Sequence, residues 1–486
     1  MQSAAHSADA FNFAAARSIV RTLHEHGYEA WLAGGCVRDL LLGRIPKDYD
    51  VATSATPDVV LGMFPNTFAV GAHFGVVLVA TDSSSPLLAN PNQPDAAPSR
   101  VTEVATFRSD GSYSDGRHPD SVRYTQSAEE DASRRDFTIN GLLLDPDWPT
   151  PDPPISDPPI SDSRTFALRA AVVDFVGGLA DLDAGILRAI GSPEQRFTED
   201  HLRMLRAVRF AARFNLQIEP QTHAAIRAQA SRIQLISRER VRNELTYMLT
   251  EGHARAAFEQ LDELALLPQV LPEVARMKGV EQPPQFHPEG DVWTHTLLLL
   301  EQLQADCPLT LAWGALLHDV GKPATFRRAE RIRFDGHVDM GVAISADICQ
   351  RFRFSNDETA QILALVHNHM RFADAQHMKT STLKRFFRLD RFPEHLALHR
   401  MDCMAASGHL DHWNFVRERY GSMPTEALRP APLITGQDLI AAGYPPGPLF
   451  KQILHAVEEA HLDGAITTAD EALSLVRREF PYADIS

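Results

Sequence analysis

Along the first 180 residues, apolar positions alternate between helical and strand-like spacing, which predicts a small region of mixed structure. Residues 8–26 have apolar positions at helical intervals, and 28–33 form an apolar, aromatic run typical of a buried strand. Further strands are predicted at 68–70, 76–80, 101–107, 137–144 and 171–176, and short helices at 36–42, 57–64 and 128–135. We therefore expect a mixed sheet with few helices, called the head below.

From residue 195 onward the apolar spacing is almost entirely helical, apart from short strands predicted within 325–334. Two stretches interrupt the head, residues 81–100 and 146–166, and both are rich in turn-forming residues, with a repeated DPPIS in the second. We expect both to be insertions outside the core. The predicted fold class is α+β, with a small mixed-sheet head followed by an all-α body. The predicted domains are residues 1–180, 181–270, 271–425 and 426–486.

The composition narrows the functional classes without changing this picture. The chain has 486 residues and a formal net charge of −16, which argues against a protein that coats nucleic acid indiscriminately. A local basic groove stays compatible with that charge. The four cysteines form no CxxC pair, no apolar run reaches eighteen residues, and the N-terminus lacks the features of a secretion signal. We expect a cytoplasmic enzyme with no membrane contact, and no protein partner is evident.

The stretch LAGGCVRDLLLGRIPKDYDVAT, residues 32–53, combines features of a nucleotide site. Gly34 and Gly35 predict a turn that a ligand can approach closely, followed by a short helix whose first N–H groups suit a phosphate. Asp48 and Asp50 would point to the same face of a strand. Two adjacent carboxylates repel each other unless a cation lies between them, and oxygen ligands favour Mg²⁺. This arrangement predicts a site for a nucleoside triphosphate and Mg²⁺.

Other head residues fit the same chemistry. Glu103 is the candidate for a third carboxylate, with an ordinary cross-strand charge as the alternative. Arg38 would bind the triphosphate, or else form a surface pair with Asp39. In RRDFTIN, Arg135 can donate two parallel hydrogen bonds to phosphate or ribose oxygens and Asp136 can accept from a ribose hydroxyl.

The motifs of the head resemble those of the class II nucleotidyltransferases, which comprise CCA-adding tRNA nucleotidyltransferases and bacterial poly(A) polymerases. The resemblance covers the whole chain except the two insertions. It implies that Arg135, Asp136 and Asn140 select the ribose. It also implies that SDGSYSDGRHPD, with Asp115 and Arg117, is the flexible loop of enzymes that add the terminal adenosine.

A second motif, FTEDHLRMLRAVRFAARF at 197–214, predicts a single helix with Thr198 as its N-cap. Asp200 and Arg203 would lie one turn apart on one face, as in an ordinary salt-bridged surface helix. The motif also resembles the EDxxR amino-acid template of class II enzymes. That resemblance implies that Asp200 and Arg203 read the base and that Glu199 supports them.

Basic residues continue along the neighbouring helices. Arg206 and Arg209 follow on the same helix and are predicted to contact the nucleotide. The helix within 232–250 resembles the buttressing helix of the family, with Ser237 as its N-cap. Its predicted exposed face consists of Glu239, Arg240 and Glu244.

Histidines and aspartates recur between residues 286 and 410. A single histidine of this kind is usually structural, but imidazoles combined with carboxylates bind divalent transition metals. The pattern resembles an HD phosphohydrolase domain, which implies the ligands His295, His318, Asp319 and Asp402, with His337 and His369 as additional ligands or phosphate contacts. An inactive HD scaffold stays open as the alternative.

The resemblance implies completion or repair of the 3′-terminal CCA of tRNA from CTP and ATP, with release of pyrophosphate. Within the family, the alternatives are an enzyme that adds only A to tRNA ending in CC, and a poly(A) polymerase. A different class is an HD phosphohydrolase with a vestigial RNA-binding head. The C-terminal segment 426–486 is expected to pack on the HD helices and contact tRNA.

Overall fold

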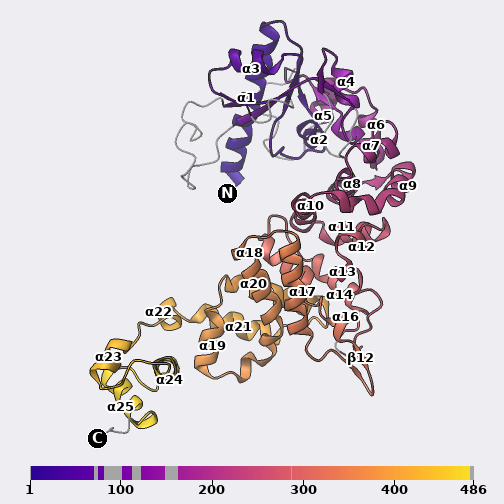
Figure 1. Ribbon diagram of the computed structural model, residues 1–486. Coiled ribbons are helices and arrows are strands. Elements are labelled where there is room, and N and C mark those ends of the chain that lie inside the picture. The colour runs from indigo at the N-terminus through magenta and orange to yellow at the C-terminus, as the bar shows by residue number, and fades with distance from the viewer. Residues whose placement is uncertain are drawn as a thin grey trace. The chain divides into compact units, whose positions relative to one another are not determined.

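The computed structural model describes residues 2–69, 75–80, 101–111, 122–147, 162–285 and 287–481. The chain divides into two compact units, Met1–Glu244 with Gln260–Val270, and Leu245–Glu259 with Leu271–Ser486. Figure 1 follows the chain through both units by colour. Among the helices of the described residues, none combines the length and apolar content needed to cross a membrane.

The head contains a seven-stranded mixed sheet with the strand order β3-β4-β5-β2-β1-β8-β9. Strands β2 and β5 are parallel, and the other neighbouring strands are antiparallel. The strands are β1 Ala30–Ala33, β2 Val51–Thr53, β3 Thr67–Phe68, β4 Val76–Ala80, β5 Val101–Thr106, β8 Leu143–Leu144 and β9 Val172–Val173. A separate hairpin pairs β6 Arg108–Asp110 with β7 Val122–Tyr124. The predicted α+β class and mixed sheet are confirmed.

Helices of the head cover this sheet through an apolar core. Ile19 and Leu23 of α1 are buried with Val51 and Val104 of the central strands. The head helices are α1 Gln2–Glu25, α2 Gly35–Leu41, α3 Pro57–Met63, α4 Ala128–Ser133, η3 Thr138–Asn140 and α5 Asp162–Ala170. Since α5 begins at Asp162, it overlaps the end of the second predicted insertion. Residues 81–100 and 148–161 lie outside the described residues.

The strand predicted at 137–144 is wrong over its first half. Thr138–Asn140 form the 3₁₀ turn η3, and only Leu143–Leu144 pair in the sheet. The turn is held by side chains: the Asn140 amide donates to the Asp136 carboxylate at 3.0 Å, and Thr138 donates to Asp181 at 2.7 Å. These polar contacts outweigh the strand propensity of the apolar residues.

After the head, the first unit is largely helical. Its elements are α6 Gly178–Ala184, β10 Ile186–Leu187, α7 Pro193–Glu199, α8 Arg203–Phe214, β11 Gln217–Ile218, α9 Pro220–Gln229, η4 Ala230–Leu235 and α12 Leu267–Val270. Two further helices, α10 Arg238–Thr250 and α11 Ala254–Glu263, each contribute residues to both units.

The single helix predicted at 197–214 is wrong, because the structure has two helices with a break at Asp200. Helix α7 is N-capped by Ser192 and ends at Glu199, and Asp200 is extended with φ −142° and ψ 105°. Thr198 is therefore not an N-cap; its hydroxyl donates to the Glu194 carbonyl one turn earlier, at 2.8 Å. Helix α8 then begins at Arg203.

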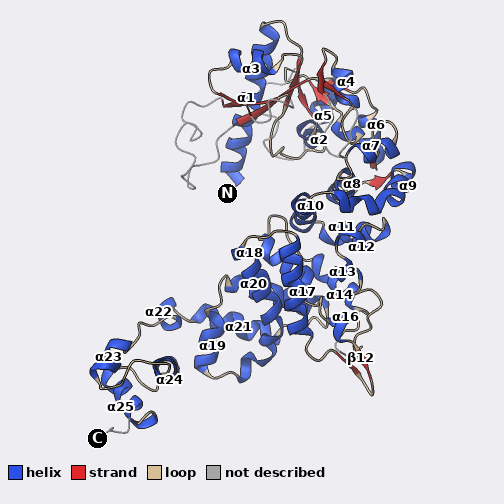
Figure 2. Cartoon of the chain, viewed as in Figure 1, coloured by secondary structure: helices blue, strands red, loops and turns tan. Residues whose placement is uncertain are grey.

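The second unit is almost entirely helical, as Figure 2 shows. Its helices are α13 Pro272–Ala275, α14 Val292–Leu300, α15 Leu309–Leu317, α16 Lys322–Thr325, α17 His337–Arg351, α18 Asn356–Asn368, η5 His369–His377, α19 Thr380–Phe387, α20 Phe392–Ala405, α21 Asp411–Ser422, α22 Thr425–Leu428, α23 Gly436–Ala441, α24 Leu449–Leu462 and α25 Ala469–Glu479. The hairpin of β12 Arg327–Arg328 and β13 Ile332–Arg333 confirms the strands predicted within 325–334. The division into four domains stays a prediction.

Candidate functional site

Two carboxylates lie where β1 and β2 meet at one end of the head sheet. The Ala33 amide donates to the Asp50 carbonyl at 3.0 Å, so Asp50 continues the strand pairing just before β2. Between the two aspartates, Tyr49 is buried and packs edge-on against Phe13 with ring centroids 5.5 Å apart. Because side chains alternate along extended backbone, Asp48 and Asp50 face away from that core on a common side.

Glu103 joins this pair from the neighbouring strand. The parallel pairing of β2 and β5 aligns Val51 with Val104, which places Glu103 beside Asp50. Burial raises the pKa of Asp50 to about 7, and the negative charges of Glu103 and Asp48 act in the same direction. Burial and Asp48 also raise the pKa of Glu103. Three mutually repelling carboxylates form a site that a hard divalent cation would stabilise.

A glycine turn borders the carboxylates. Gly34 has φ +75°, and a Cβ at this position would lie 2.7 Å from Nη1 of Arg135. Only glycine therefore permits the guanidinium to lie directly against the turn. Arg135 is also close enough to Asp50 to favour its ionised form. Gly35 is the first residue of α2, so the predicted turn and helix occur together.

Arg135 is oriented by Asp131, a residue that the sequence reasoning missed. The Asp131 carboxylate is buried and accepts from Arg134 at 2.7 Å and from Arg135 at 3.0 Å. Burial raises the pKa of Asp131, but the two guanidinium groups lower it below its usual value. The spacing of an aspartate three and four residues before two arginines on a helix was the available signal.

Arg38 is buried, so the alternative that made it a surface charge is wrong. Its guanidinium donates to Asp39 at 2.7 Å and to the side chain of Asn140, and it lies 4.2 Å from the ring centroid of Phe214. Burial lowers the pKa of Arg38. These contacts indicate that Arg38 positions η3 and α8, and its binding to a triphosphate stays a prediction.

Asp136 connects η3 to α8. It pairs with Arg206 at 2.8 Å and accepts from the Asn140 amide at 3.0 Å. Burial raises the pKa of Asp136, but Arg206 and Asn140 outweigh it and bring the pKa to about 2. The carboxylate is therefore ionised at neutral pH, as acceptance from a ribose hydroxyl requires.

The break between α7 and α8 separates the two predicted base readers. Asp200 accepts from the Leu202 amide at 3.0 Å and pairs with Arg240 at 3.0 Å, whereas Arg203 pairs with Glu199 at 2.7 Å. The prediction that Asp200 and Arg203 share one helical face is therefore wrong. The hydrogen bond from the Leu202 amide and the ion pair with Arg240 of α10 hold Asp200 outside the helix.

Helix α10 contacts α8 through charges that the sequence reasoning placed in solvent. Glu244 is buried, and its carboxylate lies 2.9 Å from Nε of Arg209. The predicted exposure of Glu244 is therefore wrong. Arg240, also predicted to be exposed, forms its ion pair with Asp200. The flexible-loop candidates Asp115 and Arg117 lie outside the described residues.

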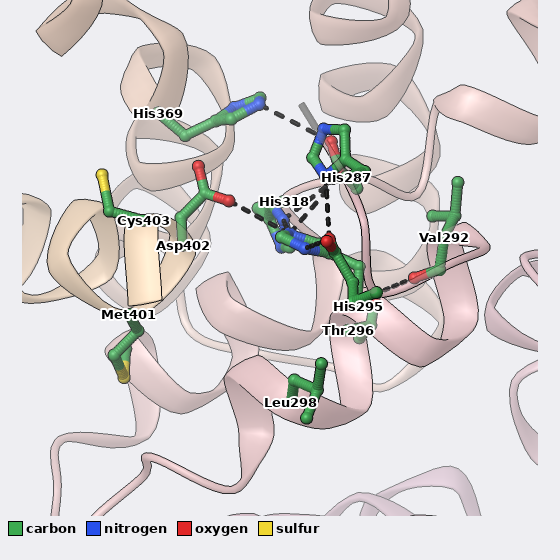
Figure 3. A network of polar contacts seen from close by, with 12 residues as sticks. His287, Val292, His295, Thr296, Leu298, His318, His369, Met401, Asp402 and Cys403 are labelled. Atoms are coloured by element: carbon green, nitrogen blue, oxygen red, sulfur yellow. Dashed lines mark hydrogen bonds and ion pairs between the residues drawn. The ribbon is translucent and has the colours of Figure 1, made fainter. Parts of the chain in front are cut away.

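A second cluster lies in the other unit. The Nε2 atom of His295 is 3.0 Å from the Asp402 carboxylate and 3.3 Å from Nε2 of His318. Figure 3 shows these side chains pointing toward one another, with His369 nearby. Asp319 is buried with its Oδ2 3.2 Å from Nε2 of His318. The structure thus brings together the four predicted HD residues.

His337 and His369 face the other oxygen of Asp319. Their Nε2 atoms lie 3.9 Å and 3.7 Å from its Oδ1, and neither has a hydrogen-bond partner although both are buried. Three groups of possible ligand atoms result among the described residues: His295 with His318 and Asp402, Asp319 with His337 and His369, and His287 with Glu289 and His295. Lys322, 2.7 Å from Asp319, adds a positive charge beside them.

Each histidine of this cluster is fixed through its other ring nitrogen. The Nδ1 atoms of His318, His337 and His369 lie 2.9, 3.0 and 2.6 Å from backbone carbonyls, so Nδ1 must be the donor. His295 uses Glu289 in this role, at 2.7 Å. In the neutral form of each ring, a proton on Nδ1 leaves the Nε2 lone pair free, which is the arrangement of metal-binding histidines. Glu289 is a further residue that the sequence reasoning missed.

The pKa values of the histidines and of Asp319 in this cluster depend on burial and on the charged groups beside them. Burial lowers the pKa of His295, but Asp402 and Glu289 outweigh it and bring the pKa to about 9. Burial lowers the pKa of His369 to about 4, so this ring is neutral at physiological pH. The pKa of Asp319 lies well below its usual value, because Lys322 and His318 outweigh its burial.

Comparisons with known proteins agree with the head geometry. Residues 30–188 match the family described as "Poly A polymerase head domain". Residues 215–278 match "Probable RNA and SrmB-binding site of polymerase A", and 337–476 match a family described as domain 2 of tRNA nucleotidyltransferase. The CCA-adding enzyme of Geobacillus thermodenitrificans is 37% identical over 254 residues, which are 52% of this chain and 54% of that relative. Over these matched residues, the chain is a relative of CCA-adding enzymes and poly(A) polymerases.

Other CCA-adding enzymes show the same similarity. That of Lactiplantibacillus plantarum is 35% identical over 289 residues, which are 59% of this chain and 62% of the relative. The chain thus spans between half and two-thirds of the length of these two relatives. The crystal structure of Bacillus stearothermophilus CCA-adding enzyme in complex with CTP is 26% identical, with a TM-score of 0.68 and coverage of 96% of this chain and 97% of that one. The Thermotoga maritima CCA-adding enzyme complexed with tRNA_CCA has the same fold, with a TM-score of 0.55 at 16% identity, covering 95% of this chain and 94% of that one.

Proposed function

We propose that this chain completes or repairs the 3′-terminal CCA of tRNA by adding nucleotides from CTP and ATP without a nucleic-acid template. The observation that carries the proposal is the convergence of Asp48, Asp50 and Glu103 beside the Gly34 turn and Arg135. The 37% identical relative is a CCA-adding enzyme, and the structure similar over most of the chain binds CTP.

The carboxylate donors fit Mg²⁺, because all are hard oxygen ligands and because burial, together with the charges of Glu103 and Asp48, raises the pKa of Asp50. Asp48 and Asp50 would hold it, with Glu103 as the third carboxylate. When bound, the ion would neutralise charge on the triphosphate and polarise the α-phosphorus. The proposed ligand set also accounts for the burial of Asp50 in a site where a carboxylate alone is costly.

The chain's own residues would orient the reactants. Arg135 would hold the triphosphate and Asp136 would accept from the ribose hydroxyl. The 3′-hydroxyl oxygen of the tRNA forms a bond to the α-phosphorus while the bond to the β-phosphate bridge breaks. Pyrophosphate leaves with that electron pair, and the hydroxyl proton is released to water.

Base selection would depend on the break between α7 and α8. The ion pairs of Asp200 with Arg240 and of Arg203 with Glu199 would hold the carboxylate and the guanidinium in fixed orientations. A rigid acceptor and donor can hydrogen-bond the edge of a base. Arg206 and Arg209 stay candidates for nucleotide contacts, although each is paired with an acid.

Nucleotide counting tests this proposal. The chain is incubated with labelled CTP and ATP and with tRNA that ends either before CCA or in CC. We expect three nucleotides on the first substrate and one A on the second. Addition of A to the CC end alone would instead identify an A-adding enzyme, and long A tails a poly(A) polymerase. Failure to extend either RNA would reject the proposal.

A second function is proposed for the histidine cluster, namely metal-dependent hydrolysis of phosphate esters. Its support is the pair of buried, unpartnered Nε2 atoms of His337 and His369 facing Asp319. Such atoms are costly unless a ligand satisfies them. Imidazole and carboxylate donors fit a divalent transition metal, which would supply a Lewis acid and a more acidic water.

Metal analysis tests the second function. We expect the purified chain to retain Mn²⁺, Co²⁺ or Ni²⁺ after dialysis and to release phosphate from p-nitrophenyl phosphate. His318→Ala should abolish both, whereas His367→Ala, on an exposed ring of α18, should change neither. Phosphate release that persists in His318→Ala would discard this site. A vestigial scaffold would show neither metal nor hydrolysis in the unmodified chain.

The remaining assignments are narrower. We propose that α23–α25, which form an apolar cluster of their own, contact tRNA. A cytoplasmic location also stays a prediction, supported by four free cysteines.

A further inference from the structure

The β12–β13 hairpin bounds a pocket beside the histidine cluster. The two strands pair Arg327 with Arg333 and Arg328 with Ile332. The hairpin side chains enclose a volume of about 780 Å³ together with Pro283, Pro284 and Met370. A pocket of this size is typical for a small-molecule ligand of nucleotide dimensions.

Three arginines line the pocket, and only part of their charge is neutralised locally. Arg328 pairs with Glu281 at 3.1 Å, and Arg333 lies 3.4 Å from Asp335. Within the part of the chain that the structure describes, Arg331 has no ion pair. The side chains of Arg328 and Arg333 are 68% and 51% exposed, so a ligand can reach them. Glu330 and Asp335 are the acids among the lining residues, so the three lining arginines outnumber the lining acids by one before the pairing of Arg328 with Glu281 is counted.

The pocket and the cluster share structural elements. The Phe334 carbonyl accepts from Nδ1 of His337 at 3.0 Å, and the Phe334 ring lies 5.4 Å from Nζ of Lys322, the partner of Asp319. A second link is Met370, which lines the pocket and directly follows His369 in the sequence. The pocket lining therefore adjoins the histidine cluster through Phe334, whose carbonyl accepts from His337, and through Met370, the neighbour of His369 in the chain.

We infer that the histidine cluster acts on a small nucleoside carrying at least two phosphate groups. One phosphate lies at the histidines, and another is held by the guanidinium groups of Arg331 and Arg333, which suit bidentate contacts with phosphate. Pro283, Pro284 and Phe334 provide apolar surface for the base or the ribose. This inference rests on the proposed hydrolysis of phosphate esters.

The reaction is the hydrolysis of one monoester. The oxygen of water forms a bond to phosphorus, and the bond between phosphorus and the ribose oxygen breaks. The ribose oxygen leaves with the electron pair and takes a proton that the water releases. The products are inorganic phosphate and a nucleoside with one phosphate fewer, and no oxidant or further reactant is needed.

Two probes test the inference, one with a second phosphate group and one without. Adenosine 3′,5′-bisphosphate and p-nitrophenyl phosphate are each incubated with the Mn²⁺-loaded full chain. For Arg331→Gln/Arg333→Gln, we expect kcat/KM to fall about 10-fold to 100-fold with the bisphosphate, because charge-assisted hydrogen bonds are lost, and to change less than about threefold with the monophosphate. The matched control is Arg327→Gln, which removes a charge from the same hairpin without altering the pocket lining. Equal losses with both probes, or no loss with either, would overturn the inference.

Binding separates this inference from the proposed hydrolysis. If the unmodified chain hydrolyses neither probe, the hydrolytic proposal fails by itself. Calorimetric binding of adenosine 3′,5′-bisphosphate is then measured in an Asp48→Ala/Asp50→Ala background, which weakens binding in the head. An affinity that Arg331→Gln/Arg333→Gln lowers at least about tenfold supports the pocket. An affinity that these substitutions leave unchanged, or no binding at all, overturns it.

Discussion

Asp48→Asn or Asp50→Asn is expected to lower the rate of CTP incorporation into tRNA by about a thousandfold. Each substitution removes one negative oxygen ligand from the carboxylates at the start of β2, and stabilisation by a metal ion in phosphoryl transfer is worth several kcal/mol. The chain should still fold, since the burial of Asp50 raises its pKa to about 7 and the neutral side chain removes that electrostatic cost. Single-turnover incorporation at saturating CTP measures the effect.

A matched control distinguishes loss of the proposed metal site from the general effect of removing one negative charge. Asp58 is an exposed acid on α3 of the same head, so Asp58→Asn should leave incorporation within about twofold of the unmodified rate. Incorporation that survives in both Asp48→Asn and Asp50→Asn would show that the reaction takes place elsewhere.

Gly34→Ala is expected to raise the KM for CTP about tenfold and to lower the apparent melting temperature. The new Cβ would lie 2.7 Å from Nη1 of Arg135, so the guanidinium must move and its proposed charge-assisted bond to the triphosphate would be weakened. The backbone at φ +75° and ψ −125° is also unfavourable for alanine, at a cost of about 1–3 kcal/mol. Steady-state kinetics and thermal unfolding measure the two effects.

Gly27→Ala separates the clash from the backbone strain. Gly27 also has a positive φ, of +82°, but a Cβ there would meet nothing within 4 Å. We expect it to lower the melting temperature while leaving the KM for CTP unchanged. A KM that rises equally in both variants would reject the assigned role of the Gly34–Arg135 contact.

Local patterns predicted the parts of the head whose structure is set by neighbours in sequence. The apolar run before Gly34 forms β1, and the positive φ of Gly34 agrees with the predicted turn. The alternation around Tyr49 likewise follows from strand geometry, because one buried aromatic side chain directs its two neighbours to the opposite side. These features need no information about distant residues.

The errors occur where distant charges determine the backbone or the burial. The helical periodicity continues through Asp200, so nothing local indicates that its carboxylate accepts from the Leu202 amide and pairs with Arg240. In the same way, Arg38 and Glu244 are charged residues on amphipathic helices, and only their partners Asn140 and Arg209 explain why they are buried. Such pairings depend on tertiary structure, which a periodicity argument does not contain.

The histidine cluster shows a related limit. Its residues come from several separate elements, and the sequence reasoning grouped them through a resemblance to a known domain. The orientation of each ring depends on partners such as Glu289 and the Phe334 carbonyl, which carry no sequence signature. The arginine pocket was likewise not predicted, because a short exposed hairpin with several arginines is usual at a protein surface.

The central claim is that Asp48 and Asp50 jointly bind the metal ion that positions a nucleoside triphosphate. A crystal structure of the full chain with CTP and Mn²⁺, analysed by anomalous scattering, tests it most directly. We predict an anomalous peak within about 2.0–2.3 Å of carboxylate oxygens of both residues, beside the CTP phosphates. CTP phosphates bound away from the Gly34 turn, with no ion between Asp48 and Asp50, would contradict it.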